Sequence, residues 1–168
     1  MKKFRTYQEK LWKGKFGDDY IDRNKSDSLL SSKIFMFSQI INSTKDIKSV
    51  FEIGSNIGLN LVAINKLLPS ARLHGIELNK KAYNELAKIN YINSYYGSFL
   101  NFDKDITVDF VFTCTLLIHI DPSLLWLVYD KIAKISKRYV LMAEYYSPTQ
   151  QEIIYRGKKD CLFKGDFA

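Results

Sequence analysis

The chain has 168 residues, of which 46% are hydrophobic and 14% aromatic, and its formal net charge is +7 at pH 7. This length and composition predict one globular domain over residues 1–168 and exclude a disordered chain, while no apolar run approaches the ~20 residues of a membrane-spanning helix. The positive net charge could favour binding to a polyanion such as nucleic acid. The lysines are scattered along the sequence, however, so we expect a solvated lysine-rich surface and keep nucleic acid only as a minor alternative.

Hydrophobic periodicity divides the chain into helices and short apolar strands. A helical period places Leu30, Ile34 and Phe37 on one face, Asn79 precedes a second helix as a cap, and Asp121 with Pro122 begins a third. We treat residues 1–25 as a lid segment and 145–168 as a tail. In chain order we expect a helix over 26–44, a strand over 49–54, a helix over 59–70, a strand over 72–78, a helix over 80–90, a weak strand over 92–98, a strand over 109–117, a helix over 122–136, a strand over 138–146 and a short strand over 152–156.

Strand and helix therefore alternate with the spacing of βαβ units. The strands are apolar almost throughout, which is typical of strands that are buried on both faces. Right-handed crossovers then predict an α/β fold, a mostly parallel sheet with helices on both faces in three layers.

The stretch VFEIGSNIGLNL, residues 50–61, ends a strand on Glu52 and continues into a glycine turn. Gly54 permits a tight turn at the end of the strand, and Gly58 allows the start of the helix to pack closely. Asn56 tolerates left-handed dihedrals better than most residues. Glu77 ends the next strand 19 residues after Gly58. An acid at that place can accept hydrogen bonds from both hydroxyls of a ribose, so we predict a nucleoside site at the carboxyl ends of these strands.

Glu52 separates two classes of cofactor. A dinucleotide places its pyrophosphate on the turn and the helix N-terminus, where a nearby carboxylate is unfavourable. A ligand with a positive charge fits better, and S-adenosylmethionine carries an ammonium and a sulfonium but no phosphate. We therefore expect S-adenosylmethionine as the cofactor, with NAD as the weakest alternative.

VFEIGSNIG and GIELN together resemble the first two motifs of class I S-adenosylmethionine-dependent methyltransferases. More narrowly, the segments LWKGKFGDDYIDRN, VFTCTLLIHIDP and AEYYSPTQQEIIYRGKKDCLFKGDFA resemble the pseudaminic acid biosynthesis-associated methylases. In this family the segment that matches YGSFLNF usually has an acid that contacts the adenine amine, and Ser98 stands there instead. The resemblance implies cofactor contacts at Glu52, Gly54, Ser55, Asn56, Gly58, Glu77, Leu78, Ser98, Phe99, Thr113 and Thr115.

Methyl transfer mainly requires alignment of donor and acceptor, and a base only if the acceptor must lose a proton. His119 follows the fourth strand and is our candidate base, with a lining or structural histidine as the alternative; His74 lies inside a strand, and we expect it to be structural. Tyr20 is a second catalytic candidate. For the acceptor, a small polar molecule of the nonulosonic acid type by resemblance, we expect contacts from Arg23, Asn24, Glu144, Tyr145 and Tyr146.

Two competing functions stay open: a protein that binds or cleaves S-adenosylmethionine without an acceptor, and a nucleic-acid methyltransferase. Cys114 and Cys161 have no metal-ligand spacing, so we predict no metal, reduced thiols and a cytoplasmic location.

Only 24 residues follow Glu144, whereas the class I fold has two further strands. We therefore expect a shortened chain whose fifth strand is an open edge, covered by the tail or by a second copy in a homo-oligomer.

Overall fold

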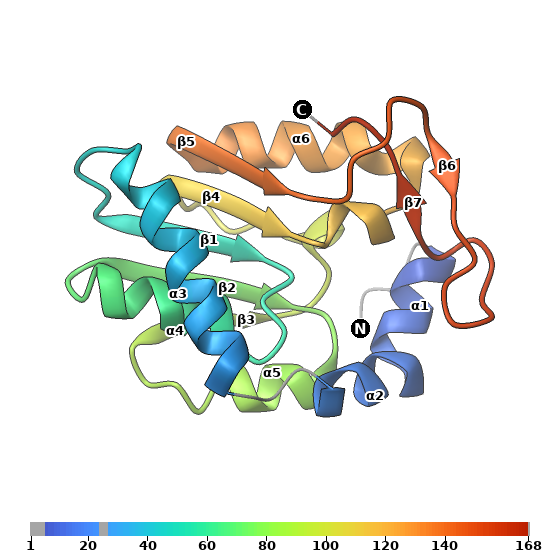
Figure 1. The fold of residues 1–168 in the computed structure, drawn as a ribbon, viewed down its shortest axis with the longest axis horizontal. Coiled ribbons are helices and arrows are strands. Elements are labelled where there is room, and N and C mark those ends of the chain that lie inside the picture. Colours follow the sequence, from blue (N-terminus) through green and yellow to red (C-terminus); the bar gives the residue numbers. More distant parts are fainter. Residues whose placement is uncertain (1–5, 24–26, 168) are drawn as a thin grey trace.

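The computed structural model describes residues 6–23 and 27–167, which form alternating helices and strands (Figure 1). The helices are α1 (Tyr7–Lys13), α2 (Lys15–Arg23), α3 (Asp27–Asn42), α4 (Leu59–Leu67), α5 (Lys80–Leu86) and α6 (Leu125–Ile135), with short 3₁₀ turns η1 (Phe99–Asn101), η2 (Leu117–His119) and η3 (Pro122–Leu124). The strands are β1 (Ser49–Ile53), β2 (Arg72–Glu77), β3 (Ile92–Tyr96), β4 (Val108–Cys114), β5 (Ser136–Ala143), β6 (Gln151–Glu152) and β7 (Phe163–Lys164).

Five strands form one sheet in the order β3-β2-β1-β4-β5, and every pairing in it is parallel. The predicted α/β architecture is therefore confirmed. The chain moves outward from β1 through β2 to β3 and then returns to the other side of β1 with β4. This reversal between β1 and β4 creates a crevice at the carboxyl ends of the strands, where ligands of such sheets bind.

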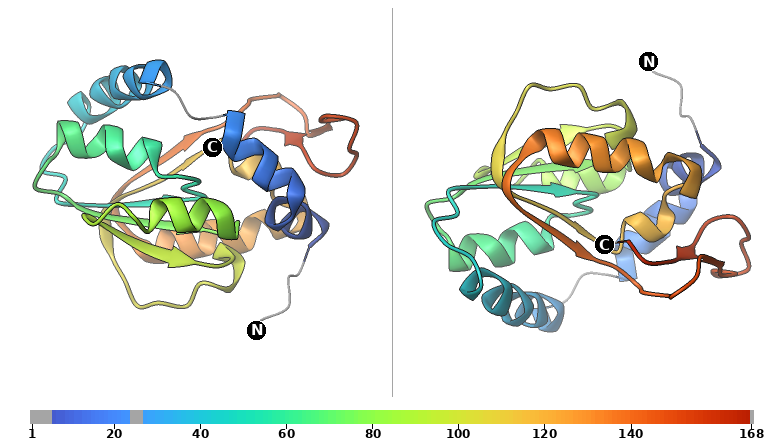
Figure 2. Two further views of the ribbon diagram at one scale, coloured as in Figure 1. Left: turned by 90° about the horizontal axis from the view of Figure 1, so that it is seen from below. Right: turned by 90° about the horizontal axis from the view of Figure 1, so that it is seen from above.

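Helices cover both faces of the sheet, with α3, α4 and α5 on one face and α6 on the other (Figure 2). The residues of β1 alternate between the two cores: Val50 packs with Phe37 and Leu61 under α3 and α4, whereas Phe51 belongs to the cluster on the α6 side. All five residues of β1 are buried. This two-sided burial explains why the strand reads as a continuous apolar run interrupted only by Glu52.

The helix caps read from the sequence are also confirmed. The Asn79 side chain accepts a hydrogen bond from the backbone of Ala82 at 2.9 Å. Asp121 accepts one from the backbone of Ser123 at 3.0 Å and begins η3, with Pro122 in its first position, directly before α6.

Residues 7–23, for which the sequence pattern predicted no helix, form α1 and α2 beyond the carboxyl ends of the strands (Figure 1). Both helices are short and rich in polar residues, so the hydrophobic periodicity of a helix is hard to recognise in the sequence. A capping box does mark the start of α1: the Thr6 side chain accepts from the backbone of Glu9, whose carboxylate accepts from the backbone of Thr6.

The tail leaves the main sheet after β5. The strand expected over 152–156 is wrong in its bounds, since β6 covers only Gln151–Glu152 and pairs antiparallel with β7 as a separate two-stranded ribbon. The tail returns to Tyr146 through a bridge to Gly165, beyond the end of β5. In the described part of the chain, β5 pairs with β4 alone. Within residues 6–23 and 27–167, no helix has the length and apolarity needed to cross a membrane.

Candidate functional site

A pocket lies at the carboxyl ends of β1, β2, β3 and β4, where α1 and α2 face the sheet. Its wall has two parts. The sheet wall comes from the turns after the strands and contains Gly54, Ser55, Asn56, Glu77 and Leu78, and the lid wall contains Gln8, Glu9, Trp12, Gly17 and Tyr20. The sequence-predicted site residues that line this pocket are Tyr20, Gly54, Ser55, Asn56, Glu77, Leu78, Ser98, Phe99, Thr115 and His119.

The glycine turn leaves backbone rather than side chains at the pocket. Gly54 has φ +76°, and a Cβ there would lie 2.8 Å from the Leu116 Cδ1 atom, so a side chain would strain the backbone and displace Leu116. Asn56 adopts a left-handed φ of 49°, which confirms the reading of this asparagine as a residue that tolerates that conformation. The backbone amides of Gly54 and Ser55 both donate to the Ile76 carbonyl at 3.0 Å, which ties the turn to β2.

Glu77 lies at the centre of the sheet wall. One carboxylate oxygen accepts from the backbone of Asn56 at 2.7 Å and the other accepts from the backbone of Asn79 at 2.6 Å. Burial raises the pKa of Glu77, and these amide hydrogen bonds oppose the shift. A carboxylate oxygen can accept more than one hydrogen bond, so Glu77 can also accept hydrogen bonds from ligand hydroxyls while it holds the turn in place.

Glu52 does not line the pocket. Its side chain is 1% exposed; Oε1 accepts from the Asn60 amide at 2.6 Å, and Oε2 has no hydrogen-bond partner among the described residues. Burial raises the pKa of Glu52 to about 8, although the Asn60 hydrogen bond opposes the shift. The carboxyl is therefore mostly neutral at pH 7.

Lys33 and Asn60 stand between Glu52 and the pocket, and the sequence pattern missed both. The Lys33 ammonium, from α3, donates to the Asn60 Oδ1 atom at 2.6 Å, and both residues line the pocket. Asn60 offered one signal: it is a polar residue inside the apolar first turns of α4, and it is only 9% exposed. Lys33 reaches the pocket only through the packing of α3 on α4, which no local pattern encodes.

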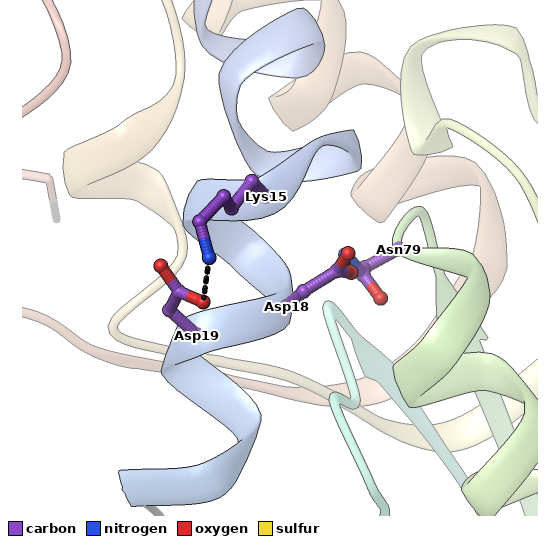
Figure 3. Close-up of polar contacts among 4 residues, drawn as sticks. All are labelled: Lys15, Asp18, Asp19 and Asn79. Carbon is purple, nitrogen blue, oxygen red and sulfur yellow. Dashed lines mark hydrogen bonds and ion pairs between the residues drawn. The ribbon is translucent and has the colours of Figure 1, made fainter.

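The lid wall is fixed to the sheet wall through Asn79 (Figure 3). The Asn79 side-chain nitrogen donates to the Asp18 carboxylate at 2.7 Å and to the Trp12 carbonyl at 3.1 Å. Gly17 permits this contact, because a Cβ there would lie 1.9 Å from the Trp12 carbonyl oxygen. The pair Lys15–Asp19, which Figure 3 also shows, is solvent-exposed and contributes little.

His119 packs among the aromatic rings of the lid and tail. Its ring lies 4.5 Å from that of Trp12 and 5.8 Å from that of Tyr155, between centroids. Its Nδ1 atom lies 2.7 Å from the Cys161 carbonyl oxygen, which only accepts, so Nδ1 carries the proton and Nε2 holds a lone pair. Burial lowers the pKa of His119 to about 4, which keeps the imidazole neutral near pH 7.

Tyr20 is the second catalytic candidate in the pocket. Burial raises the pKa of its phenol, against a hydrogen bond with the Thr115 side chain. The phenol therefore stays protonated and can donate at neutral pH.

The other predicted site residues lie away from the pocket. Gly58 faces Leu86 of α5, and Thr113 is wholly buried in β4. Glu144 accepts from the backbone of Leu116 at 3.1 Å, and burial raises its pKa. Tyr145 and Tyr146 are solvent-exposed on the tail. Arg23 ends α2, but its side chain is outside the described part, as is the whole of Asn24.

Two residues of the lid wall have buried polar atoms without a hydrogen-bond partner in the described part of the chain: Gln8 Oε1 and Trp12 Nε1. Such atoms are rare in native structures, and a ligand is one of the groups that can satisfy them. Within residues 6–23 and 27–167, no cluster of three or more His, Cys, Asp or Glu could hold a metal ion.

Comparison with known proteins identifies the fold. No family model and no curated protein matches this chain. Among solved structures, the plantazolicin methyltransferase BpumL in complex with S-adenosylhomocysteine (SAH) has a TM-score of 0.61 at 20% identity, over 80% of this chain and 55% of its own. The glycopeptide N-methyltransferase MtfA, complexed with sinefungin, has a TM-score of 0.58 at 14% identity, over 75% of this chain and 63% of its own.

A putative O-methyltransferase from Nostoc punctiforme has a TM-score of 0.63 at 17% identity, over 73% of this chain and 40% of its own. The chain thus spans about half the length of the solved relatives that it resembles. At these identities the likeness establishes the fold, which is the Rossmann-like fold of class I methyltransferases.

Proposed function

We propose that this chain binds S-adenosylmethionine and transfers its methyl group to a small polar acceptor. The observation that carries this proposal is Glu77, a partly buried carboxylate at the pocket end of β2 that directly contacts the glycine turn through the Asn56 amide. A carboxylate at this place suits the two hydroxyls of a ribose. The fold is shared with methyltransferases solved with SAH and sinefungin, which supports the same assignment.

The polar groups beside the glycine turn fit the amino-acid end of this cofactor. The Lys33 ammonium offers a partner for the carboxylate of the cofactor's methionine, and the Asn60 amide links it to Glu52 behind. Glu52 itself does not discriminate between this cofactor and a dinucleotide, because it is buried behind Asn60 and mostly neutral at pH 7. The contacts of Gly54, Ser55, Leu78, Ser98, Phe99 and Thr115 with the cofactor belong to the same proposal, since these residues line the pocket.

The reaction itself needs little chemistry from the protein. A nucleophilic atom of the acceptor attacks the methyl carbon, the carbon–sulfur bond breaks, and SAH leaves with the electron pair on sulfur. His119 can accept a hydrogen bond from the acceptor through Nε2, and Tyr20 can donate one, so together they orient it. Because the pKa of His119 is lowered to about 4, its imidazole is a weak base, and we propose that it orients the acceptor rather than removes a proton from it.

The acceptor class follows from the resemblance to the pseudaminic acid biosynthesis-associated methylases, which suggests a nonulosonic sugar. The test incubates the full chain with S-adenosylmethionine, with and without pseudaminic acid, and identifies the products by mass spectrometry. SAH that appears only with the sugar supports the proposal. Homoserine lactone or methylthioadenosine without any acceptor would instead show cleavage of the cofactor, and no turnover of any kind would contradict the sugar as acceptor.

Two further expectations stay predictions. The edge of β5 carries Val140, which is 46% exposed, and self-association would cover it. A strictly monomeric protein in light scattering at high micromolar concentration would contradict this.

Cys114 and Cys161 are both free thiols. A cytoplasmic location stays a prediction, and localisation of the tagged protein in cells tests it directly.

A further inference from the structure

Two neighbouring residues of α1, Gln8 and Glu9, line the pocket although both are almost wholly buried, at 5% and 6% exposed. Long polar side chains are rarely buried unless their polar atoms have partners. Glu9 has them: it takes part in the capping box with Thr6 and accepts a hydrogen bond from the Ser98 hydroxyl. Gln8 has a partner for only one end of its amide.

The orientation of the Gln8 amide is fixed by the tail. Its Nε2 atom donates to the Asp160 carbonyl oxygen at 2.8 Å. Because a carbonyl oxygen only accepts, the nitrogen must face Asp160, and the amide cannot be flipped. The other end, Oε1, is buried and has no hydrogen-bond partner among the described residues. The structure thus holds an acceptor in the lid wall that lacks a donor.

Ser98 locates this acceptor within the pocket. The hydrogen bond between Glu9 and Ser98 places the first turn of α1 over the segment that follows β3 at the carboxyl edge of the sheet. This segment, with Ser98 and Phe99, is where we expect the adenine of the proposed cofactor. Gln8 is adjacent to Glu9 in the same helical turn and lines the same pocket.

Ser98 is already engaged on two sides and has one lone pair left for an adenine amine. Its hydroxyl donates its only proton to Glu9 and accepts a hydrogen bond from the backbone of Leu100 at 3.1 Å. The segment after β3 therefore offers the base no carboxylate and a hydroxyl that is already engaged. A further acceptor for the amine can come from α1, the element that covers this position.

We propose that Gln8 Oε1 accepts a hydrogen bond from the exocyclic amine of the cofactor's adenine, so that the lid wall determines base specificity. This inference rests on the proposed function, because it assumes an adenine nucleoside in the pocket. Adenine presents an N–H donor at its 6-position, whereas hypoxanthine presents a carbonyl oxygen there. Two acceptors would then face each other, and the inosine form of the ligand should bind more weakly.

The test measures the affinities of SAH and of S-inosylhomocysteine for the full chain by isothermal titration calorimetry. Wild type should bind SAH about 10-fold or more tightly, since a buried polar group left unpaired costs on the order of a tenfold change in affinity. In Gln8→Leu and in Gln8→Met, which fills the same space without an amide, this preference should fall to within about 3-fold. Lys10→Ala is the matched control, since Lys10 lies on the same helix but is exposed.

The ratio between the two ligands keeps the test valid even if a variant is less stable, because loss of folded protein affects both titrations equally. An undiminished preference for SAH in both Gln8 variants would overturn the role of Gln8 and leave the proposed function standing. Equal affinity of the wild type for SAH and S-inosylhomocysteine would likewise overturn the role of Gln8 and leave the proposed function standing. A wild type that binds neither would overturn both proposals.

Discussion

The two parts of the pocket wall differ in how they are built. The sheet wall is held by two paired strands: Gly54 and Asn56 follow β1, Glu77 ends β2, and hydrogen bonds to the Ile76 carbonyl and the Glu77 carboxylate join the two strand ends. The lid wall depends on contacts between distant parts of the chain, including Asn79 with Asp18 and Gln8 with Asp160. We infer that the proposed ribose site is rigid once the sheet has formed, whereas the proposed base and acceptor sites depend on docking of α1 and α2.

The largest expected effect lies beneath the sheet wall, at Glu52. Its pKa is raised to about 8, so the neutral carboxyl stabilises the fold fully below about pH 4.5, and this contribution is lost as the pH rises through 8. Each pH unit in that window costs up to ~1.4 kcal/mol, or about 4 kcal/mol between pH 5 and pH 8. Glu52→Gln retains the acceptor for Asn60 but cannot ionise, so it should remove this loss.

Urea unfolding of wild type and Glu52→Gln at pH 5 and pH 8 measures the effect. The two proteins should have similar free energies of unfolding at pH 5, and the variant should be the more stable at pH 8. Glu77 and Glu144 also have raised pKa values and add to the slope, whereas His74 and His119 have lowered pKa values and oppose it, and these contributions are the same in both proteins. Glu152→Gln, an exposed site, is the control. Equal slopes in wild type and Glu52→Gln would refute a neutral Glu52.

Within the sheet wall itself, Glu77→Ala should weaken SAH binding about 100-fold, because it removes two hydrogen bonds to the ribose and frees the Asn56 and Asn79 amides. Calorimetric titration measures this loss, and circular dichroism checks that the fold survives. Asp130→Asn, an exposed carboxylate on α6, should bind as wild type does. Unchanged affinity in Glu77→Ala would remove Glu77 from the site.

A substitution in α2 should disrupt the docking of the lid wall while it leaves the sheet wall intact. Gly17→Ala places a Cβ 1.9 Å from the Trp12 carbonyl oxygen and 2.9 Å from the Asn79 amide nitrogen, so α2 must move away from Trp12 of α1 and from Asn79. We expect about a 10-fold loss of SAH affinity and faster hydrogen exchange confined to α1 and α2. At Gly14 the nearest atom to an added Cβ is 3.4 Å away, which makes Gly14→Ala the matched control. Equal exchange in both variants would mean that the lid does not depend on this contact.

The same division separates what the sequence could predict from what it could not. The sheet, the glycine turn, Glu77 and the caps at Asn79 and Asp121 could be predicted, because each has a signal within a short stretch: an apolar run, a glycine spacing, an acid at a strand end or a capping residue. The helices α1 and α2 and the pocket residues Gln8 and Lys33 were missed, since tertiary contacts bring them there. Glu52 was expected at the ligand, but Asn60 and Lys33 stand between it and the pocket.

The central claim is that an adenosyl cofactor lies across the carboxyl ends of β1 and β2 with its ribose on Glu77. A crystal structure of the full chain grown with SAH tests it most directly. We predict both ribose hydroxyls within hydrogen-bonding distance of the Glu77 carboxylate and the adenine beneath the first turn of α1. Electron density for the ligand at any other place, or a pocket that stays empty at saturating SAH, would contradict the account.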